Sequence, residues 1–211
     1  MLFRSAQKNF TDPQSRIMKG KDGFVQAYNA QAAVDAEAQI IVAQDVTQSA
    51  VDCGQLVPMT DAIEANLGRK PAQLSADSGY CSEANLAALE TRTIDGYVAT
   101  GRARDAVAGD AVAGTAKGGA TAAPVETPTR VAAMRAKIKA GGHESPYRLR
   151  KQLPEPVFGQ IKQARGFRQF LMRGFDQVRA EWAIVCTAHN LLKLAHRWTP
   201  SAACPMVATV A

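Results

Sequence analysis

The front part of the chain shows the apolar spacing of β-strands. Apolar and polar residues alternate loosely over residues 24–34 and again over 39–46, on either side of Asp35-Ala36-Glu37. This pattern predicts a β-hairpin over residues 24–47 with a short polar turn. Residues 1–23 are polar and rich in turn formers, so we interpret them as a loop.

The next part of the chain switches between helical and extended spacing. Residues 52–67 are predicted to form a helix that ends at Gly68, because apolar side chains recur on one face. That face consists of Leu56, Met59, Ile63 and Leu67. Residues 72–77 predict a short strand, Ser82 is a suitable cap for a helix after it, and residues 97–100 predict a further strand. The order β-β-α-β-α-β predicts a mixed α/β fold.

A change of composition divides the rest of the chain. Residues 103–129 consist largely of Ala, Gly, Thr and Pro, and such a stretch cannot bury enough surface to offset its ordering entropy. We therefore expect a flexible insertion there, followed by a basic helix over 130–140. An amphipathic helix is predicted over 178–198, and residues 199–211 are expected to be a disordered tail. One domain is thus expected over residues 1–198.

Composition and charge narrow the function only slightly. The chain has 211 residues, a formal net charge of +6 and 46% hydrophobic residues, which suits a globular protein and fits a nucleic-acid partner. Its four scattered cysteines form neither a CxxC pair nor a zinc-spaced cluster with His, so we expect buried or idle thiols. The first residues contain no apolar core of signal-peptide length and no apolar run reaches about 18 residues, so a cytoplasmic protein without a membrane span is expected.

Two carboxylates stand out by their local context. Asp77 ends an apolar strand and precedes Ser78-Gly79, and sites in open α/β sheets form at the carboxyl ends of strands. The plainer interpretation is that Asp77 begins a turn, and the local pattern alone favours that interpretation. Glu155 lies beside Pro156 at a predicted helix N-terminus, where a negative charge is favoured.

Basic side chains surround Glu155 in the sequence. Lys162 lies two turns after Glu155 on the same predicted helix face. A solvated, salt-bridged face is the commonest fate of such charges. An acid set among basic and aromatic residues is also what a Mg²⁺ site facing DNA phosphates needs. The candidate DNA-binding residues are Tyr147, Arg148, Arg150, Lys151, Lys162 and Arg165.

Four segments, in order, resemble successive blocks of insertion-sequence DDE transposases. They are residues 24–35, 76–86, 155–162 and 182–193, which read FVQAYNAQAAVD, ADSGYCSEANL, EPVFGQIK and WAIVCTAHNLLK. The similarity covers roughly residues 4–198 apart from the 103–129 insertion. Any one block is a weak signal, whereas four blocks in the same order are specific.

The resemblance implies an RNase H-like fold, which is a mixed β-sheet flanked by helices, and DNA transposition by metal-dependent strand cleavage and transfer. This family binds two Mg²⁺ (or Mn²⁺) ions with an Asp, a second Asp and a Glu, and the last two fall on Asp77 and Glu155. The implied partners are DNA, at transposon ends and target, and a second copy in a homodimer of the intact enzyme. No small-molecule cofactor is expected. A Tyr, Arg, Glu, Lys signature is matched by Tyr147, Arg150 or Lys151, Glu155 and Lys162.

The resemblance leaves the first of the three acids unassigned. In this family that Asp lies on the first strand of the sheet, before the block that matches residues 5–13. Asp12, Asp35 and Asp45 fall in blocks with other uses. We therefore expect a C-terminal catalytic part, incomplete at the N-terminal side of the fold and inactive alone. The alternatives are a non-catalytic remnant that only binds DNA or other subunits, and an unrelated α/β protein, against which the four ordered blocks argue.

Overall fold

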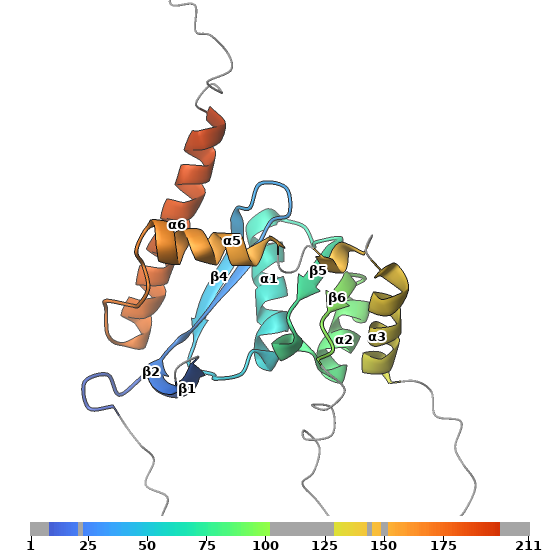
Figure 1. Cartoon of the computed structure of the whole chain (residues 1–211), viewed down its shortest axis with the longest axis horizontal. Coiled ribbons are helices and arrows are strands. Elements are labelled where there is room, and N and C mark those ends of the chain that lie inside the picture. The colour runs from blue at the N-terminus through green and yellow to red at the C-terminus, as the bar shows by residue number, and fades with distance from the viewer. Residues whose placement is uncertain (1–8, 21–22, 102–128, 143–144, 149–151, 199–211) are drawn as a thin grey trace, which may run out of the picture. The chain divides into compact units, whose positions relative to one another are not determined.

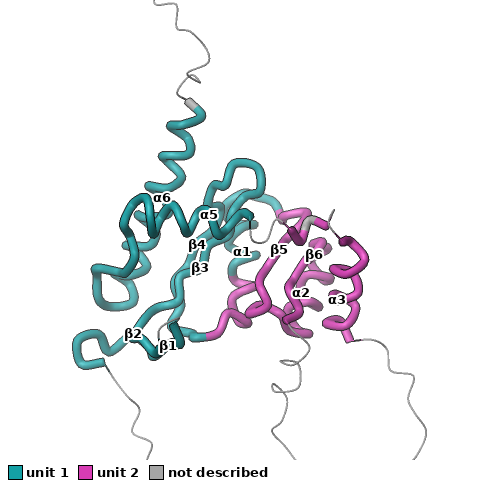
Figure 2. The backbone as a smooth tube through the Cα atoms, in the orientation of Figure 1, with its two compact units in different colours: residues 1–50, 59–69, 151–211 teal, residues 51–58, 70–150 magenta. Residues whose placement is uncertain are grey.

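The computed structural model of the chain falls into two compact units (Figures 1 and 2). The residues that it describes are 9–20, 23–101, 129–142, 145–148 and 152–198. The tail expected at 199–211, and the flexible insertion expected at 103–129 except for its last residue, lie outside these residues. Unit 1 comprises residues 1–50, 59–69 and 151–211, and unit 2 comprises residues 51–58 and 70–150.

Unit 1 contains two antiparallel strand pairs. Strand β1 (Arg16–Gly20) pairs with β2 (Gly23–Ala27), and β3 (Asn29–Val34) pairs with β4 (Ile41–Thr47). The β3–β4 pair confirms the predicted hairpin. The prediction of a loop over residues 1–23 is wrong for β1. This strand is held by backbone pairing to β2 while none of its side chains is buried, so burial imposes no apolar alternation on its sequence.

Helices cover the β3–β4 pair of unit 1. Helix α5 (Pro154–Gly159) runs into a π-helical turn over Gln160–Ala164, and α6 (Phe175–Trp198) is the long helix predicted near the end of the chain. Helix α5 packs on β3 and α6 packs on β4. The main core between them consists of Ile41, Val46, Val157, Ile161, Val178, Trp182 and Cys186.

Two neighbouring residues of α6 fix the segments around it. The indole N–H of Trp182 donates to the carbonyl oxygen of Gln31 in β3 over 3.0 Å. The carboxylate of Glu181, which is only 8% exposed, accepts from the backbone N–H of Leu171 at 2.8 Å and of Met172 at 3.0 Å. The buried charge is therefore satisfied by the loop that leads into α6.

Unit 2 is built on a pair of parallel strands. Strand β5 (Gln73–Ala76) pairs with β6 (Asp95–Val98), and α2 (Glu83–Thr91) provides the crossover that a parallel pair requires. Strand β6 begins two residues before the predicted strand at 97–100. The core consists of Leu56, Leu86, Leu89, Ile94 and Val98. The described residues of the unit also include the 3₁₀ turns η1 (Cys53–Gln55), η2 (Ser78–Tyr80) and η5 (Pro146–Arg148).

Helix α1 (Leu56–Leu67) contributes to both cores. Leu56 belongs to the core of unit 2, whereas Met59 and Ile63 pack with Ala43 in unit 1. Gly68 has a φ of +66° and donates its N–H to the carbonyl four residues earlier at 2.9 Å. The helix therefore ends at the glycine that the sequence indicates.

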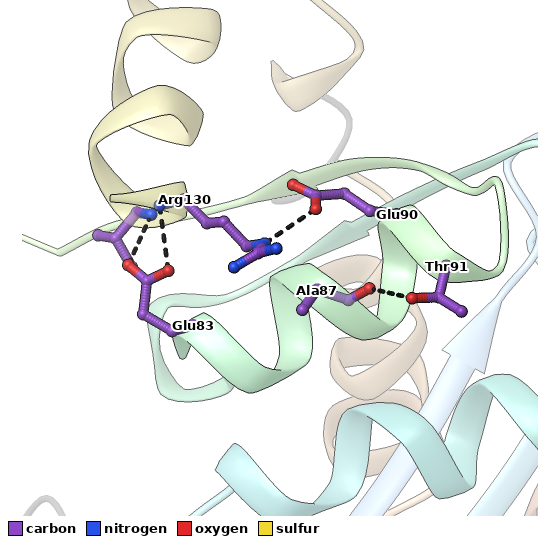
Figure 3. Close-up of polar contacts among 6 residues, drawn as sticks. Glu83, Ala87, Glu90, Thr91 and Arg130 are labelled. Carbon is purple, nitrogen blue, oxygen red and sulfur yellow. Dashed lines mark hydrogen bonds and ion pairs between the residues drawn. The ribbon is translucent and has the colours of Figure 1, made fainter. Parts of the chain in front are cut away.

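Helix α3 (Arg130–Gly141) is the predicted basic helix, and polar contacts hold it against α2 (Figure 3). The carboxylate of Glu83 accepts from the backbone N–H groups of Arg130 and Val131, each at 3.0 Å. The guanidinium of Arg130 lies 2.8 Å from the carboxylate of Glu90. The first basic side chain of α3 is thus paired with an acid of the same unit.

These elements confirm a mixed α/β fold, although the strands within the described ranges form three two-stranded sheets. The three described cysteines, Cys53, Cys81 and Cys186, are free, and burial raises the pKa of the Cys186 thiol to about 12. None of the helices in the described part of the chain has the length and apolar character that crossing a membrane demands.

Candidate active site

Asp77 occupies the turn that directly follows β5. Its backbone is extended, with φ −74° and ψ 167°, and its carbonyl oxygen accepts from the N–H of Tyr80 over 3.1 Å. After this turn, Ser82 caps α2: the hydroxyl of Ser82 accepts a 3.1 Å bond from the backbone N–H of Asn85. The side chain of Asp77 is exposed. The predicted strand, turn and cap are confirmed, and they place this carboxylate at the carboxyl end of β5.

The structure brings Asp52 beside this turn, which sequence reasoning missed. A Cβ atom added to Gly79 would lie 2.8 Å from Oδ2 of Asp52. Burial, and then the charges of Asp52 and Asp77, raise the pKa of Tyr80. No local signal singles out Asp52, because it stands at an ordinary helix start far along the sequence from Asp77.

Glu155 is the second residue of α5 in unit 1. Pro154 occupies the first position, so Glu155 stands at a helix N-terminus as predicted, and its side chain is exposed. Val157 and Ile161 are 0% and 1% exposed, so they anchor this segment in the core of unit 1. The backbone that carries Glu155 is therefore fixed by apolar packing.

The helical spacing from Glu155 to Lys162 is not uniform. A π-helical turn over Gln160–Ala164 widens the helix, so a separation of seven residues no longer corresponds to two α-helical turns. Lys162 is exposed, and its Nζ lies 5.6 Å from the centre of the Phe158 ring. Arg165 is half-buried with Nη1 enclosed. Of these two basic residues, Lys162 is the more accessible.

The remaining candidate DNA contacts belong to other segments. Arg148 is exposed and Tyr147 is half-buried in η5 of unit 2. Arg150 and Lys151 lie outside the described residues. That Arg148, Lys151, Lys162 and Arg165 gather on one side stays a prediction. The juxtaposition of Asp77, in unit 2, with Glu155, in unit 1, also stays a prediction.

Asp12 is used to hold unit 1 together. It is 8% exposed, and both of its carboxylate oxygens lie 2.8 Å from the Tyr28 hydroxyl, which donates to them. The N–H of Gly174 donates to Oδ2 over 3.3 Å. Burial alone would raise the pKa of Asp12, but the bonds from Tyr28, Gly174 and Gln14 lower it below the ordinary value. This acid therefore has a structural role that links residues distant in sequence.

Asp35 and Asp45 also have local partners. In the β3–β4 turn, Oδ2 of Asp35 accepts from the backbone N–H of Ala38 at 2.7 Å. Asp45 forms an ion pair with Arg179 of α6, with a 3.2 Å separation. These contacts agree with the inference that neither Asp35 nor Asp45 takes the place of the unassigned first acid of the family.

The donor chemistry of the two candidate acids fits a divalent metal ion. Asp77 and Glu155 both present exposed carboxylate oxygens, and oxygen ligands are those that Mg²⁺ and Mn²⁺ prefer. Across the described ranges, no three His, Cys, Asp or Glu side chains come close enough together to hold a metal ion.

Comparison with known proteins assigns the family. The model of a family described as a transposase DDE domain matches residues 5–191, which include both Asp77 and Glu155. None of the curated proteins and none of the solved structures matches the chain. The match spans most of the sequence, and the mixed α/β architecture agrees with the RNase H-like fold expected for such a domain. The chain therefore belongs to the transposase DDE domain family.

Proposed function

We propose that Asp77 and Glu155 are two of the metal-binding carboxylates of a transposase that cleaves and joins DNA strands. Family membership supports DNA transposition as the process. The observation that carries the residue assignment is their placement. Both acids are exposed on well-fixed backbone, one directly after β5 and one in the first turn of α5, and both lie within the matched span.

The residues of the chain would hold the metal ions by carboxylate oxygens. Two Mg²⁺ or Mn²⁺ ions, when bound, supply Lewis acidity that polarises a phosphodiester and activates the attacking oxygen. Asp77 is positioned by its 3₁₀ turn, and Glu155 by the core packing of Val157 and Ile161. Rigid support of this kind matters because metal ligands must be held close to their productive positions.

We further propose that basic residues near Glu155 neutralise the DNA backbone. Arg148 and Lys162 are exposed, which suits contact with phosphates. Tyr147, Arg150 and Lys151 remain part of this proposed surface. Arg165 is its weakest member, because its guanidinium is partly enclosed. A homodimer of the intact transposase is the proposed assembly on transposon ends.

The chain by itself is proposed not to turn over DNA. Asp12, Asp35 and Asp45 are each engaged in contacts within unit 1, so no acid considered from the sequence is available as the third ligand. The second candidate function is a module that binds DNA or other subunits without catalysis. Because Asp12, Asp35 and Asp45 are used in structural contacts, binding without catalysis is favoured over catalysis by the chain alone.

Metal binding tests the residue assignment directly. We expect the 211-residue chain to bind Mn²⁺, measured by the electron paramagnetic resonance signal of the free ion. Asp77→Asn and Glu155→Gln should each weaken this binding about tenfold or more, because each removes a charged oxygen ligand. Asp176→Asn is the matched control, since Asp176 is an exposed acid in the first turn of α6. Equal Mn²⁺ affinity in all four proteins would overturn the assignment.

A further inference from the structure

We propose that Asn85 is a positioning residue that fixes the Asp77 carboxylate by fastening together two turns of unit 2. The inference rests on the proposed function, because positioning affects chemistry only if Asp77 binds a metal ion. It concerns a residue that touches neither metal nor DNA in the proposed mechanism and acts through the backbone of its neighbours.

The side chain of Asn85 bridges η1 and η2. Asn85 is 7% exposed, and its Nδ2 donates to the carbonyl oxygen of Cys53 at 2.6 Å and to that of Tyr80 at 2.7 Å. An amide nitrogen carries two hydrogens, so it can serve both acceptors at once. Cys53 directly follows Asp52, and Tyr80 stands three residues after Asp77. The two acid-bearing turns are therefore held by a single buried group.

A close contact between the two turns complements this bridge. A Cβ on Gly79 would lie 2.8 Å from Oδ2, 3.4 Å from Cβ and 3.5 Å from Cγ of Asp52. These three atoms of Asp52 thus lie against the space that glycine leaves open. A larger residue at position 79 would force the Asp52 side chain to shift, because separations under 3.0 Å are not tolerated between such atoms.

Helix α2 gives Asn85 a rigid base. Its backbone N–H donates to the capping hydroxyl of Ser82, and the next residue, Leu86, is 2% exposed in the core of unit 2. Tyr80 packs against the same core and has its pKa raised by burial and by both nearby acids, Asp52 before Asp77. Because α2 is capped and packed against the core, the side-chain amide of Asn85 is held in place before any metal ion binds. A residue that positions a metal ligand must itself be held rigidly in this way.

A purely structural role of Asn85 predicts a different result. If Asn85 only satisfied buried backbone carbonyls, its loss would lower the stability of unit 2 but leave the Mn²⁺ affinity of the folded chain unchanged. If Asn85 positions Asp77, the folded variant must bind Mn²⁺ more weakly. Metal affinity measured on folded protein therefore separates the two roles.

The first experiment compares Asn85→Leu with Thr91→Ala in the full chain. Thr91 bonds only the carbonyl of Ala87 at the far end of α2, so it is a control for losing one side-chain bond on this helix (Figure 3). Asn85→Leu should weaken Mn²⁺ binding about tenfold, since it removes the two buried bonds that support the Asp77 turn. It should also speed hydrogen exchange at the N–H groups of Tyr80 and Cys81, which bond within the Asp77 turn. Thr91→Ala should change neither.

The second experiment uses a paired substitution that does not disturb the core. Gly79→Ala should weaken Mn²⁺ binding several-fold by forcing the Asp52 side chain away. Adding Asp52→Ala removes the obstructing atoms and should restore most of the lost affinity. A double variant that binds no better than Gly79→Ala would overturn the role of this contact.

The outcomes separate the two proposals. If Asp77→Asn leaves Mn²⁺ affinity unchanged, the proposed function fails and this inference fails with it. If Asp77→Asn weakens binding while folded Asn85→Leu and Gly79→Ala bind like the parent chain, the metal assignment stands and the positioning role of Asn85 is wrong. Weakened binding in all three, with rescue of Gly79→Ala by Asp52→Ala, supports the inference.

Discussion

The side chain of Asn190 pairs with both backbone groups of Ile41. Its Oδ1 accepts from the Ile41 N–H at 2.9 Å, and its Nδ2 donates to the Ile41 carbonyl oxygen at 2.8 Å. Next to it, Nε2 of His189 lies 2.9 Å from the Gln39 carbonyl oxygen. Helix α6 is thereby attached to the first residue of β4 and to the turn before it, where Gln39 has a φ of +56°.

Replacement of Asn190 should destabilise unit 1. Asn190→Ala leaves two backbone groups of a largely buried residue without partners, so we expect the free energy of unfolding to fall by about 1–3 kcal/mol. Urea unfolding followed by the fluorescence of the buried Trp182 measures this loss. Thr187→Ala is the control, because the exposed Thr187 hydroxyl bonds a carbonyl of its own helix. Equal midpoints for the two variants would contradict the role assigned to Asn190.

His189 should make unit 1 less stable in mild acid. Burial first, and then the charges of Arg165 and Lys193, lower its pKa, while the bond to the Gln39 carbonyl acts in the opposite direction. The folded state therefore binds fewer protons than the unfolded state. Its stability contribution is present above the unfolded pKa of about 6.5 and is lost as the pH falls below that value.

The free energy of unfolding should be measured against pH between about 7.5 and about 5, because the ordinary pKa of His is about 6.5. One proton changes the free energy of unfolding by at most roughly 1.4 kcal/mol per pH unit. His189→Gln should remove the slope, whereas His196→Gln, at an exposed position of the same helix, should retain it. A slope that persists in His189→Gln would assign it to another group.

The sequence predicted elements where burial imposes a period, and it failed where backbone pairing alone decides. Met59 and Ile63 are buried as their helical spacing indicates, and Gly68 ends the helix. Strand β1 was missed because none of its side chains is buried. The single strand expected from residue 24 is instead split between β2 and β3, which pair with different partners that local spacing does not encode.

The candidate site shows the same division. The turn at Asp77 and the helix start at Glu155 were predictable, because Ser-Gly and Pro are strong local signals. The roles of Asp52 and Asn85 were not, since their contacts join residues far apart in the sequence. The π-helical turn before Arg165 was also not predictable, because no residue type marks it.

Neutralising Asp12 should lower the stability of unit 1 without affecting metal binding. Asp12→Asn weakens the bonds from Tyr28 and Gly174, so we expect unfolding to become easier by about 1–3 kcal/mol. Because the pKa of Asp12 is lowered, its contribution is present above the unfolded value of 3.8 and is lost as the pH falls through the folded value. Mn²⁺ affinity should remain that of the parent chain. A loss of Mn²⁺ binding without loss of stability would instead make Asp12 a metal ligand.

DNA binding should depend on salt and on the basic residues near Glu155. Each phosphate contact contributes roughly −0.9 to the slope of log K against log salt concentration. Charge reversal at Lys151 and Lys162 should weaken binding to a duplex of arbitrary sequence and make that slope shallower. Lys139→Glu, at an exposed position in the last turn of α3, is the control for net charge. Unchanged binding after reversal at Lys151 and Lys162 would refute this surface.

The last prediction is that the chain alone does not cleave donor ends in Mg²⁺ or Mn²⁺. In a two-metal mechanism, two bound ions would stabilise the attacking and leaving oxygens, so the site needs enough carboxylates to hold both ions. Asp77 and Glu155 provide two carboxylates, and the ordinary contacts of Asp12, Asp35 and Asp45 keep those acids in structural roles. Product formation should therefore equal that of an Asp77→Ala, Glu155→Ala double variant. Cleavage that this double variant loses would mean that another acid serves as third ligand. Asp52 would then be the first to replace, because it is the acid found against the Asp77 turn.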